Sequence, residues 1–176
     1  MATTWKLDPT HSEVAFKVKH LVITTVTGYF RSFDGTVVTE DEADFTTAKV
    51  NFSIDTSSID TNQSQRDEHL KSADFFDADR YPGITFTSSS VKAKGGDEFI
   101  LEGDLTIGEV TKPVTLNVEF GGTVTDPYGN FKAGFEVSGK ISRKEFGLTW
   151  SAVTEAGAVV VSDDVKIQAS VQFVKQ

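Results

Sequence analysis

The sequence predicts an all-β fold in which about eight antiparallel strands form a barrel or a sandwich. Long stretches alternate strictly between apolar and polar residues, which is typical of strands with one buried face. Turn-forming residues separate these stretches, as in a chain that runs back and forth across a sheet. The length of 176 residues suits one domain, 1–176, and no linker or internal repeat divides it. A sheet with a single apolar face must bury that face, either by closing into a barrel or by folding over into a sandwich.

Six segments carry the clearest alternation. The first, residues 12–20, places Val14, Phe16, Val18 and His20 on one face and polar or small residues on the other. The remaining five segments are 48–55, 99–107, 114–120, 131–141 and 165–173. Weaker strands are expected at 3–7, 28–38 and 83–91, and tight turns at 95–97, 108–109 and 126–130.

One segment departs from the strand pattern. Residues 64–71 are polar, lack β-branched side chains and begin with a Ser-x-x-Asp arrangement similar to a helix N-cap. We therefore expect a short helix inserted near residues 64–73, between two strands.

Composition excludes several function classes. There are 26 acidic and 17 basic residues, so the net charge of -9 opposes nucleic-acid binding. There is no cysteine, which excludes disulfides, thiolate nucleophiles and cysteine-containing zinc sites. Phosphate-loop, nucleophile-elbow and His-Glu-x-x-His motifs are absent, and the spacing of the three histidines supports no metal site. We therefore expect no enzymatic activity, no catalytic residue, no metal and no cofactor.

The expected location follows from targeting signals. The first residues lack a basic segment followed by an apolar one, and the longest apolar run, 156–161, is far too short to span a bilayer. We expect a soluble protein that is not membrane-embedded. The cytoplasm is the simplest compartment, or the periplasm or exterior if a signal was removed upstream.

Phenylalanine is abundant, with 14 residues against one methionine. Eight of them fall on the inward-facing parity of the strands, and such rings form either a dry core or the lining of an apolar cavity. Alternation alone leaves both interpretations open. The eight residues are Phe16, Phe52, Phe86, Phe99, Phe120, Phe131, Phe135 and Phe173.

Several polar residues have positions that a dry core does not require. His20 shares the inward face of Phe16, and Arg143 continues the inward row that ends at Ile141. Arg66 and His69 lie three apart on one face of the expected helix, beside Asp67. Each either has a structural partner or contacts the polar end of a ligand. His11 and Ser12 are neighbours on a strand and so point to opposite faces, a poor geometry for a nucleophile and its base.

Several short blocks of residues occur in order along nearly the whole chain. They are Trp5-Lys6-Leu7-Asp8, His11-Ser12, Phe16-x-Val18-x-His20, Gly28-Tyr29-Phe30, Phe33-x-Gly35, Arg66-Asp67-x-His69-Leu70, Asp74-Phe75-Phe76-Asp77, Tyr81-Pro82-x-Ile84-Thr85-Phe86, Gly103-Asp104-Leu105-Thr106-Ile107, Val110-Thr111-Lys112-Pro113-Val114 and Arg143-x-x-Phe146-Gly147-Leu148. Taken together, these blocks resemble the YceI-like, polyisoprenoid-binding family.

This resemblance implies an antiparallel eight-stranded lipocalin-like barrel with a hollow interior. It implies non-enzymatic binding, carriage or sequestration of an isoprenoid, such as a polyprenyl compound or an isoprenoid quinone, or of a similar long-chain amphiphile. A solid-core interaction protein and a metal-free hydrolase of lipid-like esters are the alternatives. A homodimer is compatible with the pattern.

On this reading two groups of residues meet the ligand. The expected head-group contacts are Arg66, His69, Arg143, His20 and Asp67. The expected lining of the tail tunnel is Phe16, Val18, Phe30, Phe52, Phe75, Phe86, Phe99, Phe120, Phe135, Phe146 and Trp150.

Overall fold

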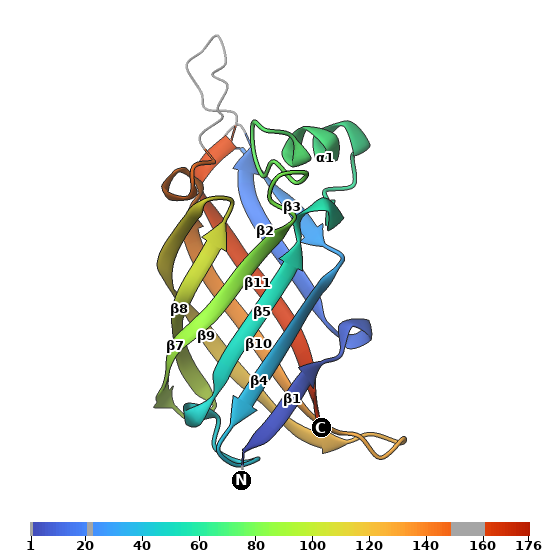
Figure 1. Ribbon diagram of the computed structural model, residues 1–176, viewed down its shortest axis with the longest axis vertical. Coiled ribbons are helices and arrows are strands. Elements are labelled where there is room, and N and C mark those ends of the chain that lie inside the picture. The colour runs from blue at the N-terminus through green and yellow to red at the C-terminus, as the bar shows by residue number, and fades with distance from the viewer. Residues whose placement is uncertain (1, 21–22, 149–160) are drawn as a thin grey trace.

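The computed structural model describes residues 2–20, 23–148 and 161–176, with the backbone alone at 20, 161 and 162. It consists almost entirely of antiparallel strands (Figure 1). The strands are β1 Thr3–Leu7, β2 Glu13–His20, β3 Thr24–Phe30, β4 Phe33–Thr39, β5 Lys49–Asp55, β6 Ile59–Asp60, β7 Gly83–Gly95, β8 Glu98–Ile107, β9 Val110–Thr125, β10 Phe131–Ser142 and β11 Val161–Lys175. The helix α1 spans Ser64–Lys71, and 3-10 helices occupy Pro9–His11 (η1), Phe45–Thr47 (η2), Thr56–Ser58 (η3) and Arg143–Phe146 (η4).

Eight strands close into a barrel, which confirms the predicted fold class. The strand order β1-β4-β5-β7-β8-β9-β10-β11 returns to β1 through a pairing of Trp5 with Lys175 and of Leu7 with Phe173. All of these pairings are antiparallel, and closure leaves no free sheet edge in this part of the barrel.

The remaining strands extend the barrel wall at one end. β2 pairs with the first part of β11, β3 pairs with β2, and the two-residue β6 pairs with β3. The prediction of one strand over 28–38 is wrong, because the strand is interrupted at Arg31 and Ser32. β3 stays with β2, whereas β4 turns to pair with β1 and β5.

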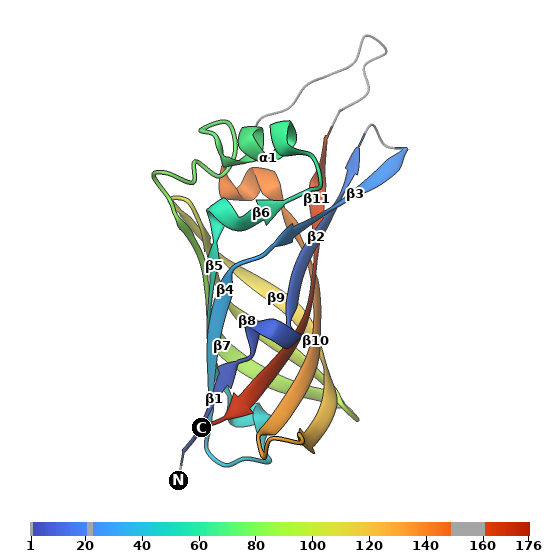
Figure 2. The same cartoon turned by 90° about the vertical axis from the view of Figure 1, so that its right-hand side faces the viewer.

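The predicted short helix is confirmed as α1, which lies across the same end of the barrel (Figure 2). Its N-cap is Gln63 rather than Ser64, since the Gln63 side chain accepts a hydrogen bond from the backbone N–H of Arg66. The helix ends at Lys71, two residues before the predicted limit, where the Ser72 N–H bonds to the carbonyl of His69. The 3-10 helix η4 lies at the same end of the barrel, beside β9 and β11.

Two hydrophobic clusters fill the barrel near its two ends. We call them the helix-end cluster and the termini-end cluster. The helix-end cluster contains the buried residues Val14, Phe30, Ile59, Ile84, Phe86, Leu101, Leu105, Ile107, Leu116, Phe146 and Leu148. The termini-end cluster contains the buried residues Trp5, Leu7, Val37, Phe45, Ala133, Val171 and Phe173.

Among the residues described, no helix has both the length and the apolar character needed to cross a membrane.

Candidate functional site

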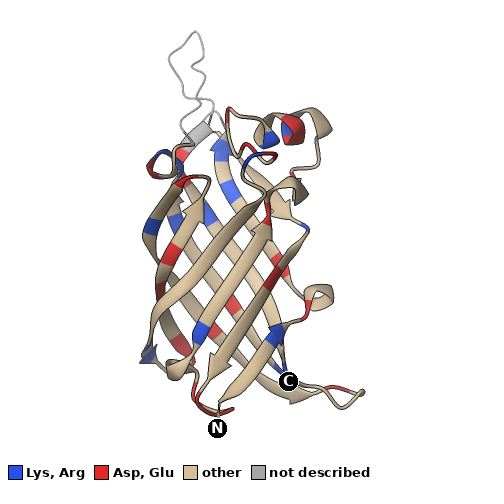
Figure 3. Cartoon of the chain, viewed as in Figure 1, with Lys and Arg blue, Asp and Glu red and all other residues tan. Residues whose placement is uncertain are grey.

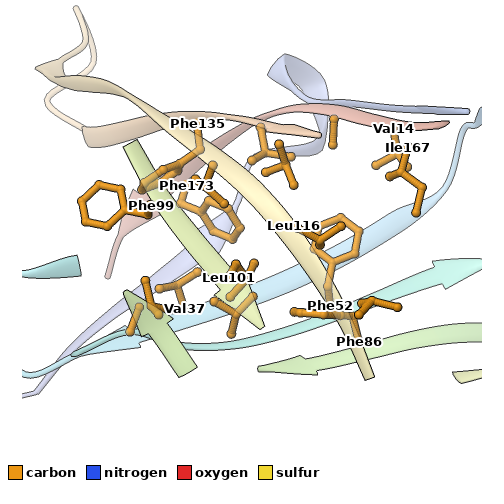
Figure 4. Close-up of a pocket in the computed structure, with 18 of the residues that line it drawn as sticks. Val14, Val37, Phe52, Phe86, Phe99, Leu101, Leu116, Phe135, Ile167 and Phe173 are labelled. Atoms are coloured by element: carbon orange, nitrogen blue, oxygen red, sulfur yellow. The ribbon is translucent and has the colours of Figure 1, made fainter. Parts of the chain in front are cut away.

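An apolar cavity of about 180 Å³ lies in the barrel between the two clusters. Its wall is built from inward-facing residues of most of the barrel strands, and the side chains drawn in Figure 4 contain only carbon beyond the backbone. Among the described residues, no polar side chain lines it. The lining residues are Val14, Val37, Phe45, Ala48, Val50, Phe52, Ile54, Phe86, Val91, Phe99, Leu101, Leu105, Val114, Leu116, Val118, Phe135, Val137, Ile167, Ala169, Val171 and Phe173.

Glycines in the wall explain why large rings leave this space open. The ring of Phe52 packs on the backbone of Gly35, its cross-strand partner, where a Cβ would lie 2.7 Å from Cδ2 of the ring. The ring of Phe86 packs in the same way on Gly103, where a Cβ would lie 2.6 Å from Cζ. Because each ring occupies the place of a missing Cβ, it lies against the wall rather than across the barrel axis.

Aromatic rings pack at both ends of the cavity. At the helix end, the Phe30 ring lies 5.5 Å from that of Phe16 and meets that of Phe76 edge-on at 5.9 Å. At the termini end, the ring of Phe45 lies 5.2 Å from Phe120 and 5.1 Å from Phe135. Such ring pairs add stability beyond the area they bury, so both ends are firmly packed.

The structure places the predicted tail-lining residues in three groups. The cavity itself is lined by Phe52, Phe86, Phe99 and Phe135. Packing around it, rather than lining, is provided by Phe16, Phe30, Phe120 and Phe146. Val18 is half-buried further out on β2, opposite Val26, and Phe75 lies outside the barrel against His69. Trp150 lies outside the described residues.

Sequence reasoning missed Phe45, which lines the cavity and packs against its termini end. It lies in η2, a single 3-10 turn between β4 and β5, where strand parity gives no information about direction. The signal that could have found it is an isolated aromatic residue within the polar loop 40–47.

The predicted head-group residues on α1 lie at the helix end and bind to their own neighbourhood. The Arg66 guanidinium donates through Nε to Thr61 Oγ1 (2.8 Å) and through Nη2 to the Thr61 carbonyl (2.6 Å). The Asp67 carboxylate accepts from the Thr61 N–H (2.8 Å) and from its hydroxyl. His69 Nε2 lies 2.9 Å from Asp74 Oδ2, and its ring meets Phe75 edge-on.

Arg143 lies on η4 and is 3% exposed, so its side chain is inside the fold as the inward row predicted. Its Nη1 donates to the carbonyl of Leu148 at 2.6 Å. Burial lowers the pKa of the Arg143 guanidinium, and the carboxylate of Asp163 acts in the opposite direction. Arg143 does not line the cavity. The side chain of His20 lies outside the described residues.

The histidine next to a serine also has a structural environment. His11 Nδ1 lies 2.9 Å from Asp8 Oδ2, and the Ser12 hydroxyl donates to the carbonyl of Asp8 at 2.7 Å. Both side chains therefore support the turn at η1. In the described ranges, no three His, Asp or Glu side chains are grouped so that they could hold a metal ion.

Comparison with known proteins identifies the family of this chain. The YceI-like domain family matches residues 5–173. The protein YceI of Escherichia coli O157:H7 is 44% identical over 178 residues, covering 100% of this chain and 89% of the relative.

Solved structures agree with this match. BcnA of Burkholderia cenocepacia superposes with a TM-score of 0.82 at 25% identity, over 94% of this chain and 98% of the other. The YCEI protein of Campylobacter jejuni gives 0.77 at 32% identity, over 90% of each chain. A polyisoprenoid binding domain from Saccharophagus degradans gives 0.67 over 98% of each chain; at 17% identity this similarity establishes the fold alone.

Proposed function

Because the chain belongs to the YceI-like domain family, we propose that it binds an isoprenoid, either a polyprenyl compound or an isoprenoid quinone, or a similar long-chain amphiphile. In this proposal it carries or sequesters the lipid and catalyses no reaction, and it needs no metal or cofactor. The observation that carries the proposal is the wholly apolar cavity between the two clusters.

Burial of the ligand chain supplies the affinity. Each Å² of apolar surface removed from water contributes roughly 25 cal/mol, whatever the exact shape of the chain. This contribution is non-directional, so the cavity accepts several chain types of similar width. Selectivity then depends on a few polar contacts at one end.

The size of the cavity defines what has to move. Ligand pockets usually measure roughly 300–1,000 Å³, whereas this one measures about 180 Å³. It holds a short segment of a long chain as it stands. A longer chain has to displace the rings at one end, and the helix end is where the polar candidates Arg66, Asp67, His69 and Arg143 lie. We place the head group there, with the chain directed toward Phe45.

The first test is extraction of freshly purified protein with organic solvent, followed by mass spectrometry. A long-chain lipid in stoichiometric amount is the expected result. A protein that carries no lipid and also fails to bind added geranylgeraniol or a short-chain isoprenoid quinone contradicts the proposal. That result would favour the solid-core interaction protein.

The second test fills the cavity. Ala169 lines the cavity from β11 and packs against both clusters, so Ala169→Phe places a ring in the open space. We expect geranylgeraniol affinity to fall more than about tenfold, which corresponds to the loss of burial of about 55 Å² of apolar surface, the equivalent of about two methylene groups. The melting temperature should stay close to that of the wild type, since the ring enters a void.

The matched control is Ala43→Phe, which makes the same change at an exposed position of the loop between β4 and β5. It should leave the affinity unchanged. If the two variants bind geranylgeraniol equally well while both remain folded, the chain does not occupy this cavity.

A further inference from the structure

Three lysines lie side by side on the outside of the barrel. Lys140 of β10 pairs with Lys166 of β11, which pairs with Lys17 of β2. Their side chains face outward, because Ile167, the neighbour of Lys166, lines the cavity and successive residues point to opposite faces. Directly opposed side chains have Cβ atoms about 4.5–5.5 Å apart. The three ammonium groups therefore form one continuous row.

This row is unfavourable for the fold itself, since like charges directly opposite each other destabilise a sheet. Within the described ranges, Lys140 alone of the three has a carboxylate partner, Asp164, at 3.5 Å between two exposed side chains. In the part of the chain that the structure describes, no acidic group lies within ion-pair distance of Lys17 or Lys166. In a chain of net charge -9, the local excess of positive charge needs a reason other than stability.

The same face is segregated by charge along its length. Four residues from the lysine row, the row Glu136–Ser170–Glu13 crosses the same three strands and is acidic. The acidic row continues to Glu119 and Glu98 on β9 and β8. In Figure 3 the basic segments of β2, β11 and β10 lie toward the end of the barrel that carries α1.

An exposed apolar residue lies beyond the lysine row, four residues before Thr27, the β3 partner of Lys17. Ile23 is 77% exposed and precedes β3 at the tip of the β2–β3 hairpin. This hairpin reaches away from the barrel (Figure 2). On its outer face Lys17 and Lys19 lie opposite Thr27 and Thr25, so the outer face of the hairpin carries no acidic residue at these positions.

We propose that this face docks on the surface of an anionic lipid bilayer. The docking face consists of Lys17, Lys140 and Lys166, with Ile23 at its tip. Anionic headgroups are complementary to a row of lysines, and an exposed isoleucine inserts at the boundary of headgroups and chains. Anionic headgroups repel the acidic row, so the end of the barrel that carries this row faces away from the membrane. The proposal extends the proposed function, because a bilayer is where a carrier of membrane lipids collects or delivers its ligand.

The net negative charge does not prevent this docking. At physiological ionic strength the Debye length is about 8 Å, so charges beyond this distance are largely screened. The acidic row lies four residues away along the strands, which is about 13 Å at 3.3 Å per residue. Asp164 offsets the charge of Lys140, so Lys17 and Lys166 supply the net positive charge that faces the membrane.

The test measures binding of the full chain to vesicles without added isoprenoid. We expect sedimentation with phosphatidylcholine vesicles that contain phosphatidylglycerol, release at high salt, and little binding to pure phosphatidylcholine. Each lysine near an anionic surface strengthens binding roughly fivefold, so Lys17→Gln/Lys166→Gln should weaken it roughly 30-fold. The control Lys6→Gln/Lys49→Gln removes the same charge from exposed positions on β1 and β5 and should bind as the wild type does.

A second pair of variants tests the apolar tip. Ile23→Ser should weaken vesicle binding several-fold, whereas Val124→Ser, at an exposed position of β9, should not. Melting curves establish that each variant is folded, and salt-induced release of the wild type tests the charge contribution without any substitution.

Three results would overturn the docking proposal. They are equal binding of the two double-lysine variants, equal binding to anionic and zwitterionic vesicles, and binding to heparin without binding to vesicles. Geranylgeraniol titrations of the same proteins keep the two proposals apart: docking can fail while ligand binding persists, and the reverse also holds.

Discussion

Single glycines decide where the largest side chains of this barrel point. Gly28 of β3 lies opposite Phe16 of β2, and a Cβ at Gly28 would lie 2.2 Å from Cζ of the Phe16 ring. No real side chain tolerates this distance, so the ring fits only because residue 28 is a glycine. Since Phe16 also packs on Phe30, the glycine determines the packing of the helix-end cluster.

The change Gly28→Ala tests this dependence. The added methyl group forces the Phe16 ring against Phe30, and overpacking of this kind costs about 1–3 kcal/mol. For a chain of this length we expect the melting temperature to fall by roughly 3–10 °C. Calorimetry of wild type and variant measures the difference.

The matched control is Gly134→Ala in β10. A Cβ at Gly134 meets nothing within 4 Å, so the same substitution there should leave the melting temperature unchanged or slightly higher. Equal losses at both positions would show that strand glycines matter for a reason other than the ring at Phe16.

At the scale of elements, polar contacts with Thr61 attach α1 to the barrel end, and the side chains of Arg66 and Asp67 each make two of them. The helix is short and polar and contributes no buried residue. Asp67 joins it to Thr61, a buried residue that follows β6, through two hydrogen bonds to one carboxylate oxygen. Short helices are marginal in isolation, so this contact, together with the Arg66–Thr61 hydrogen bonds and the packing of Leu70, limits how often α1 leaves the barrel end.

We therefore expect Asp67→Ala to loosen α1 selectively. Hydrogen bonds to a charged group contribute about 1.5–3 kcal/mol, so local opening should become at least about tenfold more frequent. Amide hydrogen exchange in residues 64–80 measures the opening, and exchange in β8 and β9 should not change. Dissociation of bound geranylgeraniol should accelerate if the chain enters at this end.

Glu68→Ala is the control for this substitution. Glu68 is exposed and, among the residues that the structure describes, pairs only with Lys71, at 3.4 Å, so its removal should leave exchange in α1 near the wild-type rate. If Glu68→Ala loosens the helix as much as Asp67→Ala does, loss of a negative charge rather than loss of the Thr61 contact is responsible.

Elements with strict alternation were predictable, and bends were not. The strands at 99–107 and 131–141 are present because each apolar residue at every second position needs a buried face. The bend at Arg31 and Ser32 contains no glycine or proline, so nothing local marks the change of strand partners.

The same distinction holds for the candidate site. Strand parity places Phe52, Phe86, Phe99 and Phe135 on the inner face, and they line the cavity. Parity could not distinguish residues that line a cavity from those that pack beside it, such as Phe120, because that difference depends on how far along the barrel a ring lies. It also gave no information on Phe45, which lies outside every strand.

At the scale of the whole molecule, an ion pair links the N-terminal turn to the distant strand β10. Lys132 Nζ lies 2.8 Å from Asp8 Oδ2 and 3.6 Å from Asp126 Oδ2. The side chains of Lys132 and Asp8 are only 10% and 15% exposed, so solvent screens this pair less than a surface pair. The pair lies near the place where β1 and β11 close the barrel, and it therefore couples barrel closure to the charge of Asp8.

Stability should fall in acid because of this pair. The hydrogen bond from Lys132, followed by that from Thr10, holds the pKa of Asp8 well below its usual range. The pKa of Asp8 in the unfolded chain is about 3.9. A lowered folded-state pKa gives stability that is complete above the unfolded value and is lost progressively as the pH falls below it.

Denaturant unfolding of the wild type and of Asp8→Asn, from neutral pH down to about pH 2, tests this prediction. The variant should be less stable at neutral pH, although Asp126 remains as a partner of Lys132. Its stability should fall less steeply than that of the wild type below about pH 4. Asp104→Asn removes a charge from an exposed position of β8 and should run parallel to the wild type throughout. Parallel curves for the wild type and Asp8→Asn would instead place the acid sensitivity in other carboxylates. The Asp8–Lys132 pair would then be a local contact rather than a control on closure of the barrel.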